Sequence, residues 1–303
     1  MQNFNTSCNL DQIGFAKDVS TFFLWFTIVF SIVGLGANLL SYITIHFMSI
    51  NSSSVVYIQA LAVWDSLSLI FDGPIDMLQL IFNYTMPSRI LQKLDNTNDL
   101  TTTHVAHWLV VAISFDRFTA VYFPILYQTT FSKAKFGIAV VIGIVIVSYA
   151  TMGAMTFVAF DKCVRNLCGL GPKWKDTYVM EIVLFYQGVA PTICILLLNT
   201  LIAIKILVRK NEKSFHQKKR SNDVELLLFI VSISFLCFNA ISQVSWYIRF
   251  NAENWGIVCS VTFVIAITLE SLVMVFNNGI NFFLYILLGR TFRKSFLATF
   301  GCK

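Results

Sequence analysis

Charged residues are scarce in this sequence: of its 303 residues only 13% are Asp, Glu, Lys or Arg, whereas 56% are hydrophobic. Soluble domains carry about 25% charged residues, so this chain has too few charges to cover a water-soluble globule of its size. Phe is correspondingly frequent, with 29 residues. The composition therefore excludes an ordinary soluble domain and predicts that lipid surrounds much of the surface.

Several signatures of other functions are also missing. Seven cysteines are scattered along the chain, and none forms the paired short spacing of a zinc site. Neither a His-Glu-x-x-His motif nor a Gly-x-Ser-x-Gly motif occurs, so we expect no enzyme activity. The net charge of +6 does not form a basic stripe with interleaved aromatics, which disfavours nucleic-acid binding. The first 20 residues lack a long apolar core, so no cleavable signal peptide is expected.

Seven stretches are long enough to cross a bilayer, which takes roughly 20 mostly apolar residues in a helix. The third, about 90–122, is polar in its first half, so it should lie centrally and face protein or water. We predict an all-α seven-helix bundle over 21–288, preceded by an extracellular N-terminus (1–20) and followed by a cytoplasmic tail (289–303). The other six stretches are about 21–46, 55–82, 135–160, 179–208, 224–250 and 257–288.

Basic residues predict which end of the bundle faces the cytoplasm. They gather after the third and fifth spans and in the tail, and the positive-inside rule assigns that side to the cytoplasm. The N-terminus then lies outside, together with the glycosylation sequons at Asn5 and Asn83. The basic residues are Lys133, Lys135, Arg209, Lys210, Lys213, Lys218, Lys219, Arg220, Arg290, Arg293, Lys294 and Lys303.

The tail carries Phe292, Phe296 and Phe300 at intervals of four residues, with basic residues between them. This spacing predicts an amphipathic helix lying on the anionic inner leaflet. Cys302 could carry a palmitoyl chain there, and an unmodified cysteine is an equally good interpretation.

Polar residues inside predicted spans are costly and therefore mark candidate functional positions. Asp65 lies in the second span, Asn38 in the first, and Asn277, Asn278 and Asn281 in the seventh. A carboxylate among amides can hold water or a small cation, or it can join helices in a structural hydrogen-bond network; both interpretations stay open.

Asp116 and Arg117 lie at the inner end of the third span. The adjacent acid can hold the guanidinium near the membrane interface, and the alternative is an ordinary snorkelling arginine. His104 and His107 of the same span could be metal ligands, but interior hydrogen bonding explains them better.

Short motifs occur in order along five of the spans: Gly36-Ala37-Asn38, Leu61-Ala62-Val63-Trp64-Asp65, Asp116-Arg117-Phe118, Pro191 and the run from Asn281 to Tyr285. Together they resemble the rhodopsin-like (class A) G-protein-coupled receptors, in particular the peptide-receptor branch and its FMRFamide-type members. The resemblance spans about residues 20–300. The chain departs from the family where Gln92 replaces a cysteine, where Phe282 replaces the seventh-span proline, and where residues 235–240 lack the sixth-span tryptophan and proline.

The resemblance implies a plasma-membrane receptor for signal transduction, in which a heterotrimeric G protein docks against Arg117, next to Asp116. It also implies that Tyr285 swings inward on activation. Asn38, Asp65, Asn277 and Asn281 would form a sodium and water pocket, although Ala106 replaces a commonly hydroxylated partner. A retinal opsin would need a lysine in the seventh span, and residues 257–288 contain none.

Acidic residues toward the outer ends of the spans predict a cup of negative potential that suits a cationic ligand. An amidated peptide ending in Arg-Phe has that chemistry, and aromatic residues of the sixth span could add cation–π contacts. The alternatives are a chemosensory receptor for small molecules and, less favoured, a seven-helix transporter, which would be expected to show internal repeats. The candidate ligand-binding residues are Asp72, Asp76, Asp99, Glu270, Gln243, Trp246 and Tyr247.

Overall fold

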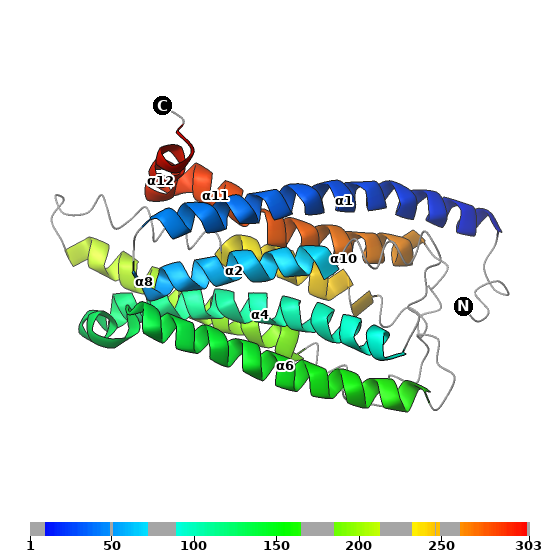
Figure 1. The fold of residues 1–303 in the computed structure, drawn as a ribbon, viewed down its shortest axis with the longest axis horizontal. Helices are drawn as coiled ribbons and strands as arrows, with labels where there is room; N and C mark the ends of the chain where they lie inside the picture. Colours follow the sequence, from blue (N-terminus) through cyan, green and yellow to red (C-terminus); the bar gives the residue numbers. More distant parts are fainter. Residues whose placement is uncertain are drawn as a thin grey trace.

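The computed structural model describes residues 10–48, 51–71, 89–164, 185–212, 232–245, 247–248 and 261–301. Every regular element in these ranges is a helix, and the long helices lie side by side with α12 across one end (Figure 1). Each of the seven predicted spans is helical where it is described, which confirms the all-α bundle. The elements are α1 (Leu10–Phe47), α2 (Ser53–Ile70), α4 (Arg89–Tyr122), α5 (Pro124–Leu126), η3 (Tyr127–Phe131), α6 (Ala134–Val164), η5 (Phe185–Val189), α8 (Ala190–Glu212), the helical residues 232–245, α10 (Val261–Gly279), α11 (Asn281–Leu288) and α12 (Arg290–Phe300).

Within the described ranges, four helices are long and apolar enough to cross a membrane alone, and two bent pairs qualify if each pair counts as one span. The helix α1 begins at Leu10, earlier than the predicted 21. Its first turns contain Asp11, Lys17 and Asp18, so its apolar part still begins at Thr21. The four spans are Thr21–Phe47, Ser53–Ile70, Ala134–Ala154 and Phe185–Lys205, and the pairs are Leu100–Tyr122 with Pro124–Phe131 and Thr268–Gly279 with Asn281–Leu287.

The seventh span bends by 45° between α10 and α11, although no proline stands there. The bend follows Gly279, which packs so closely on α1 that a Cβ on Gly279 would lie 3.1 Å from the Cα of Gly34. Glycine is one of the residues at which helices kink. The backbone bond from Leu284 N to Ile280 O, at 3.2 Å, carries the helix across the bend.

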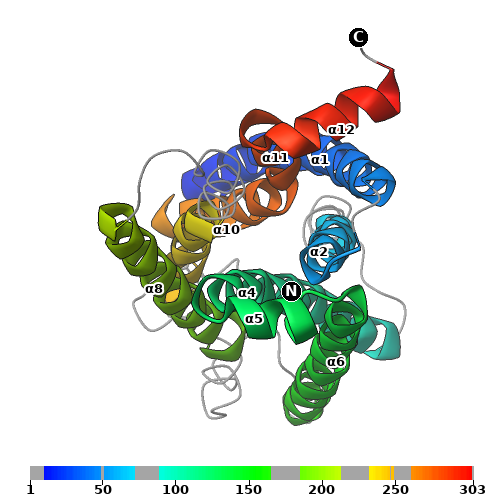
Figure 2. The same cartoon turned by 90° about the vertical axis from the view of Figure 1, so that its left-hand side faces the viewer.

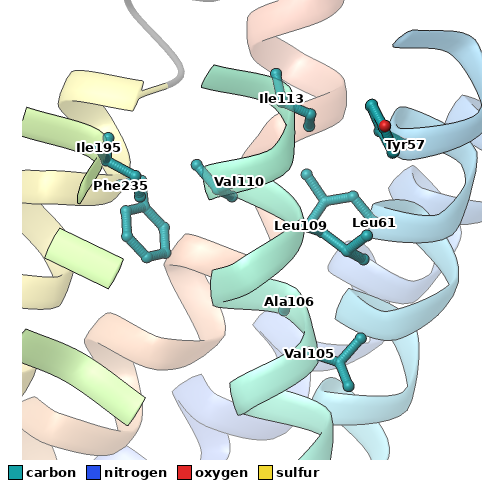
Figure 3. Close-up of a cluster of buried hydrophobic side chains, with 9 residues drawn as sticks. All are labelled: Tyr57, Leu61, Val105, Ala106, Leu109, Val110, Ile113, Ile195 and Phe235. Atoms are coloured by element: carbon teal, nitrogen blue, oxygen red, sulfur yellow. The ribbon is translucent and has the colours of Figure 1, made fainter. Parts of the chain in front are cut away.

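The third span, α4, lies inside the bundle, as its polar half predicted. Viewed along the bundle, it lies between α2 and α8 with α6 alongside (Figure 2), and it packs against all three. Its residues from Thr101 to His107 are all buried. Farther along, Leu109 lies next to Leu61 of α2 and Ile113 lies on the side of Tyr57, while Val110 lies on the side of Ile195 and Phe235 (Figure 3).

The amphipathic tail helix is present as α12. Part of its aromatic face meets the bundle, because Phe292 and Phe296 pack against Phe282 with ring centroids 6.1 and 5.6 Å apart. Phe300 stays exposed. Phe282, which stands where the family has a proline, therefore anchors α12 to α11.

Candidate functional site

A buried carboxylate organises the end of the bundle where α4 finishes, here called the Arg117 end. Asp116 accepts hydrogen bonds from Ser53 Oγ at 2.6 Å, Ser54 Oγ at 2.7 Å and Tyr127 OH at 3.2 Å. These donors come from the first turn of α2 and from η3, so one side chain joins three segments. Hydrogen bonds to a charged acceptor are about twice as strong as neutral ones, so Asp116 fixes the geometry of this end.

Arg117 is linked to Asp116 through Ser54, which corrects the interpretation that the acid holds the guanidinium directly. Arg117 Nη2 donates to Ser54 Oγ at 2.9 Å, and Ser54 Oγ donates to Asp116. Both residues are described, and no ion pair joins Asp116 and Arg117; hydroxyl donors bind both carboxylate oxygens instead. Arg117 Nε is buried with no hydrogen-bond partner in the described ranges. Among the residues that the structure describes, the guanidinium is therefore held by one neutral oxygen, Ser54 Oγ.

Local sequence explains why these donors converge. Ser52 caps α2 by accepting from Val55 N at 3.4 Å, which is a preferred role of serine at a helix start. The chain then turns by 120° after α4, where Pro124 opens α5, and this turn brings Tyr127 back toward Asp116. The bond from Ser53 N to Ser132 O, at 3.0 Å, closes the same loop onto α2.

A second buried carboxylate lies midway along the bundle. Asp65, 2% exposed, accepts from Asn281 Nδ2 at 2.8 Å. Asp65, Asn277 and Asn281 line a cavity of about 10 Å³, close to the space that one water molecule needs. Asn38 was predicted to belong to this pocket but does not line it; its Nδ2 donates to Asn278 O at 3.0 Å and joins α1 to α10.

These residues fit a sodium ion poorly. The cavity has room for about one water, and one oxygen of Asp65 is already taken by Asn281. Ala106 lines the same cavity and offers no oxygen from its side chain. An ion with attendant waters does not fit this arrangement, whereas a single water does.

His104 belongs to a network between α4 and α6. Trp108 Nε1 donates to His104 Nε2 at 2.8 Å, and His104 Nδ1 lies 2.8 Å from Ser148 Oγ. An indole can only donate, so Nε2 is the acceptor and the proton of the neutral ring sits on Nδ1. The interpretation of His104 as an interior hydrogen-bonding residue is confirmed.

His107 reaches the fifth span instead. Its Nδ1 lies 2.6 Å from the carbonyl oxygen of Gln187 in η5, and a carbonyl can only accept, so Nδ1 is the donor. On the sixth span, Asn239 Nδ2 donates to Gly188 O at 3.3 Å and to Thr192 Oγ1. Side chains of the third and sixth spans thus bind neighbouring groups of one turn of the fifth span.

The predicted ligand-binding residues are only partly described. Gln243 donates to Asn239 Oδ1 at 3.4 Å, and its Oε1 is buried with no hydrogen-bond partner in the described part of the chain. Glu270 is buried in α10 at 8% exposure, whereas Tyr247 is 52% exposed. Asp99 lies in α4, but its side chain is outside the description. Asp72, Asp76, Trp246, Asn5, Asn83 and Cys302 also lie outside the described residues.

Tyr285, which the resemblance predicts to be a switch residue, is buried beside α12, with its ring centroid 5.4 Å from that of Phe292. Sequence patterns do not indicate several partners in these networks, because single polar residues and backbone carbonyls in apolar helices carry no motif. Pro191 was the only available hint, because it marks an irregular turn in the fifth span. The missed residues are Ser53, Ser54, Tyr127, Ser148, Gln187, Gly188, Thr192 and Asn239.

Comparison with known proteins agrees with this geometry. Residues 36–285 match the family model of the 7 transmembrane receptor (rhodopsin family). The chain is also similar to the RYamide receptor of Tribolium castaneum, with 22% identity over 255 residues that cover 77% of this chain and 69% of the relative. Members of this family are multi-pass membrane proteins that act as signalling receptors. Since the match covers most of its length, the chain belongs to the rhodopsin family of seven-transmembrane receptors.

Proposed function

We propose that this protein is a plasma-membrane receptor that binds an extracellular, cationic, amidated neuropeptide and activates a heterotrimeric G protein through Arg117. The N-terminus lies outside the cell, and the Arg117 end faces the cytoplasm. The single observation that carries the proposal is the Arg117 end itself. There hydroxyl donors bind both oxygens of a buried acid, while within the described ranges the neighbouring arginine is held by one serine.

That arrangement suits a switch. A hydroxyl-to-guanidinium bond is weaker than a bidentate ion pair, so an incoming partner that offers carbonyl or carboxylate oxygens can displace Ser54 from Arg117. Asp116 keeps its own donors, Ser53 and Tyr127, when Ser54 loses Arg117. We take the arrangement with Arg117 on Ser54 as the resting one.

The ligand class rests on charge and on the relative. Glu270 and the expected acids Asp72, Asp76 and Asp99 favour a cationic ligand, and the buried Gln243 Oε1 offers a hydrogen-bond acceptor. The similar insect protein is named as a receptor for RYamide, that is, a peptide amide carrying arginine and tyrosine. This ligand has the same chemistry as the expected Arg-Phe-amide, an arginine beside an aromatic amide terminus.

The test is a ligand panel on cells that express the protein with a promiscuous G protein. The panel contains synthetic peptides ending in Arg-Tyr-amide or Arg-Phe-amide, the same peptides as free acids, and biogenic amines. We expect signalling to an amidated peptide and a large loss of potency for its free acid. A response to small odorant molecules alone would favour a chemosensory receptor, and uptake of substrate without signalling would favour a transporter; either result contradicts the proposal.

Recognition of the ligand's positive charge is tested by comparing two peptides that differ in that charge. Asp99→Asn should weaken an amidated peptide with arginine more than the same peptide with citrulline, since only the first carries a cation. Equal losses for both peptides would count against a charge contact at Asp99.

Orientation is tested with epitope tags. A tag at the N-terminus should bind antibody on intact cells, and a tag at the C-terminus should bind only after permeabilisation. Tags detected on the same side of the membrane would refute the seven-span orientation.

A further inference from the structure

A groove of about 330 Å³ opens at the Arg117 end, between the last turn of α1, the first turns of α2 and the start of α6. Its volume is within the range of small-molecule sites. Viewed from this end, α2 lies between α1 and α6 (Figure 2). All three helices are candidate membrane spans, and all three have an end here. The groove therefore lies at the depth where lipid headgroups meet the protein.

Polar side chains with free hydrogen-bonding capacity line this groove. His46, Asn51 and Gln59 make no side-chain hydrogen bond to any residue in the described ranges. Ser52 Oγ accepts from Val55 N, so its own proton is still available for donation. The groove thus presents hydrogen-bond donors to whatever occupies it.

Gln59 restricts the kind of occupant. It follows Ser52 by seven residues, so it lies about 10 Å deeper along α2, and it is half-buried. An amide at this depth is costly in hydrocarbon unless a polar group meets it. A phospholipid supplies such a group, because its glycerol ester carbonyls lie just below the phosphate and accept hydrogen bonds.

The groove continues into the membrane as an apolar surface. One helical turn deeper, each of the three helices exposes an apolar residue on the face that lines the groove. These residues are Tyr42 of α1, Val63 of α2 and Ile138 of α6, each four residues from a lining residue. Acyl chains that extend from a headgroup in the groove would lie along them.

The charges around the groove favour an anion. Ala134 lines it, and the residues on either side of Ala134 in the chain are the exposed lysines Lys133 and Lys135. None of the lining residues is acidic. Asp116 is nearby, but it is buried and its oxygens accept from hydroxyl groups. A phosphate at the mouth of the groove would therefore meet positive charge without facing a carboxylate.

We propose that this groove binds one anionic glycerophospholipid. The phosphate lies at the mouth beside Lys133 and Lys135, Gln59 Nε2 donates to an ester carbonyl, and the acyl chains follow the apolar surface. The site itself requires no peptide ligand and no G protein. Only its assignment to the inner leaflet, where anionic lipids are concentrated, rests on the proposed orientation.

The charge contact is tested by native mass spectrometry of the purified full-length protein in detergent, titrated with dioleoylphosphatidylserine or dioleoylphosphatidylcholine. The wild type should bind phosphatidylserine more tightly. Because one lysine near an anionic surface contributes about fivefold, Lys133→Gln combined with Lys135→Gln should weaken phosphatidylserine binding roughly tenfold or more. Phosphatidylcholine binding should stay almost unchanged. Lys205→Gln is the control, since Lys205 lies on α8 over the ring of Tyr122, and it should preserve the preference.

The amide contact has a different signature. The ester carbonyls are common to both lipids, so Gln59→Leu should weaken both by about threefold, the typical effect of a polar side-chain bond in a membrane. Gln128→Leu is the matched control, because Gln128 is exposed at the same end but does not line the groove. Ala134→Leu, which fills the groove, should also weaken both lipids and gives a second measurement if another variant fails to fold.

Several results would overturn the site. An unchanged preference for phosphatidylserine in the lysine pair would remove the charge contact, and unchanged affinities in both Gln59→Leu and Ala134→Leu would place the lipid elsewhere. Displacement of the lipid by inorganic phosphate alone would indicate a site for a free anion. Displacement by cholesterol, which has no phosphate, would indicate a sterol groove.

These measurements separate the lipid site from the proposed function. A protein that answers no peptide but shows the expected lipid preferences would contradict the proposed function and leave the site standing. A protein that signals normally but binds both lipids equally would contradict the site alone.

Discussion

The neighbouring helices α4 and α6 differ in the side chains that they bury and expose. α4 buries its polar residues from Thr101 to His104 in the bundle, whereas α6 exposes large apolar residues such as Ile142 and Ile146. In a soluble protein the reverse would hold. In a bilayer, however, lipid accepts apolar side chains without cost and rejects polar ones, so polarity marks the interior of this bundle and the residues that communicate across it.

The largest expected effect is the difference in stability between shortening a buried apolar residue of α4 and shortening an exposed one of α6. Leu109 of α4 is 0% exposed and Ile142 of α6 is 52% exposed. Leu109→Ala should destabilise the protein by about 2–5 kcal/mol, because it leaves a cavity, and Ile142→Ala should be nearly neutral because lipid fills the space. Thermal unfolding of the two purified variants in detergent checks this difference. Similar losses for both variants would mean that Ile142 does not face lipid.

Two glycines of α6 allow a crowded position and an open position to be compared within one helix. A Cβ on Gly137 would lie 3.0 Å from the Cα of Ser53, whereas nothing lies within 4 Å of a Cβ on Gly143. Gly137→Ala should cost about 1–3 kcal/mol by overpacking. Gly143→Ala should be neutral or stabilise by about 0.5–1 kcal/mol through helix propensity. Thermal unfolding measures both, and a neutral Gly137→Ala would contradict the close contact between α2 and α6.

The smallest expected effect concerns two hydroxyls of α6. Ser148 bonds across to His104, whereas Thr151 bonds only to carbonyls of its own helix. Ser148→Ala should therefore lower stability by about 0.6 kcal/mol, up to about 1.7, while Thr151→Val should have little effect. Hydrogen exchange at α4 near His104 should rise only in the first variant; an equal rise in both would show that the cross-helix bond contributes nothing.

Much of the fold followed from hydropathy alone. The runs of apolar residues predicted all seven spans, and the polar start of the third span predicted its central position, because a helix that holds Thr101 to His104 cannot face lipid on every side. The aromatic period of Phe292 and Phe296 predicted α12. The early start of α1 was not predicted, because its polar first turns lie outside the apolar segment and helical hydrogen bonding does not depend on hydropathy.

The candidate site was less predictable. The sequence indicated Asp65 with Asn281 and the position of Arg117, but not the serines that bind Asp116. A hydroxyl group can bond to the backbone of its own helix instead of to another helix, so sequence cannot tell Ser54, which binds Asp116, from Thr151, which bonds within α6. The bonds from His107 and Asn239 to the fifth span depend on the register of a π-helical turn, which no side-chain pattern specifies.

The central claim is that Arg117 transmits a peptide signal to a G protein at the cytoplasmic end of the bundle. It is tested most directly by measuring peptide-evoked G-protein dissociation in Arg117→Ala and wild type at matched surface expression. We expect the variant to reach the surface, to bind labelled peptide and to produce no dissociation. Wild-type signalling by Arg117→Ala would contradict the account.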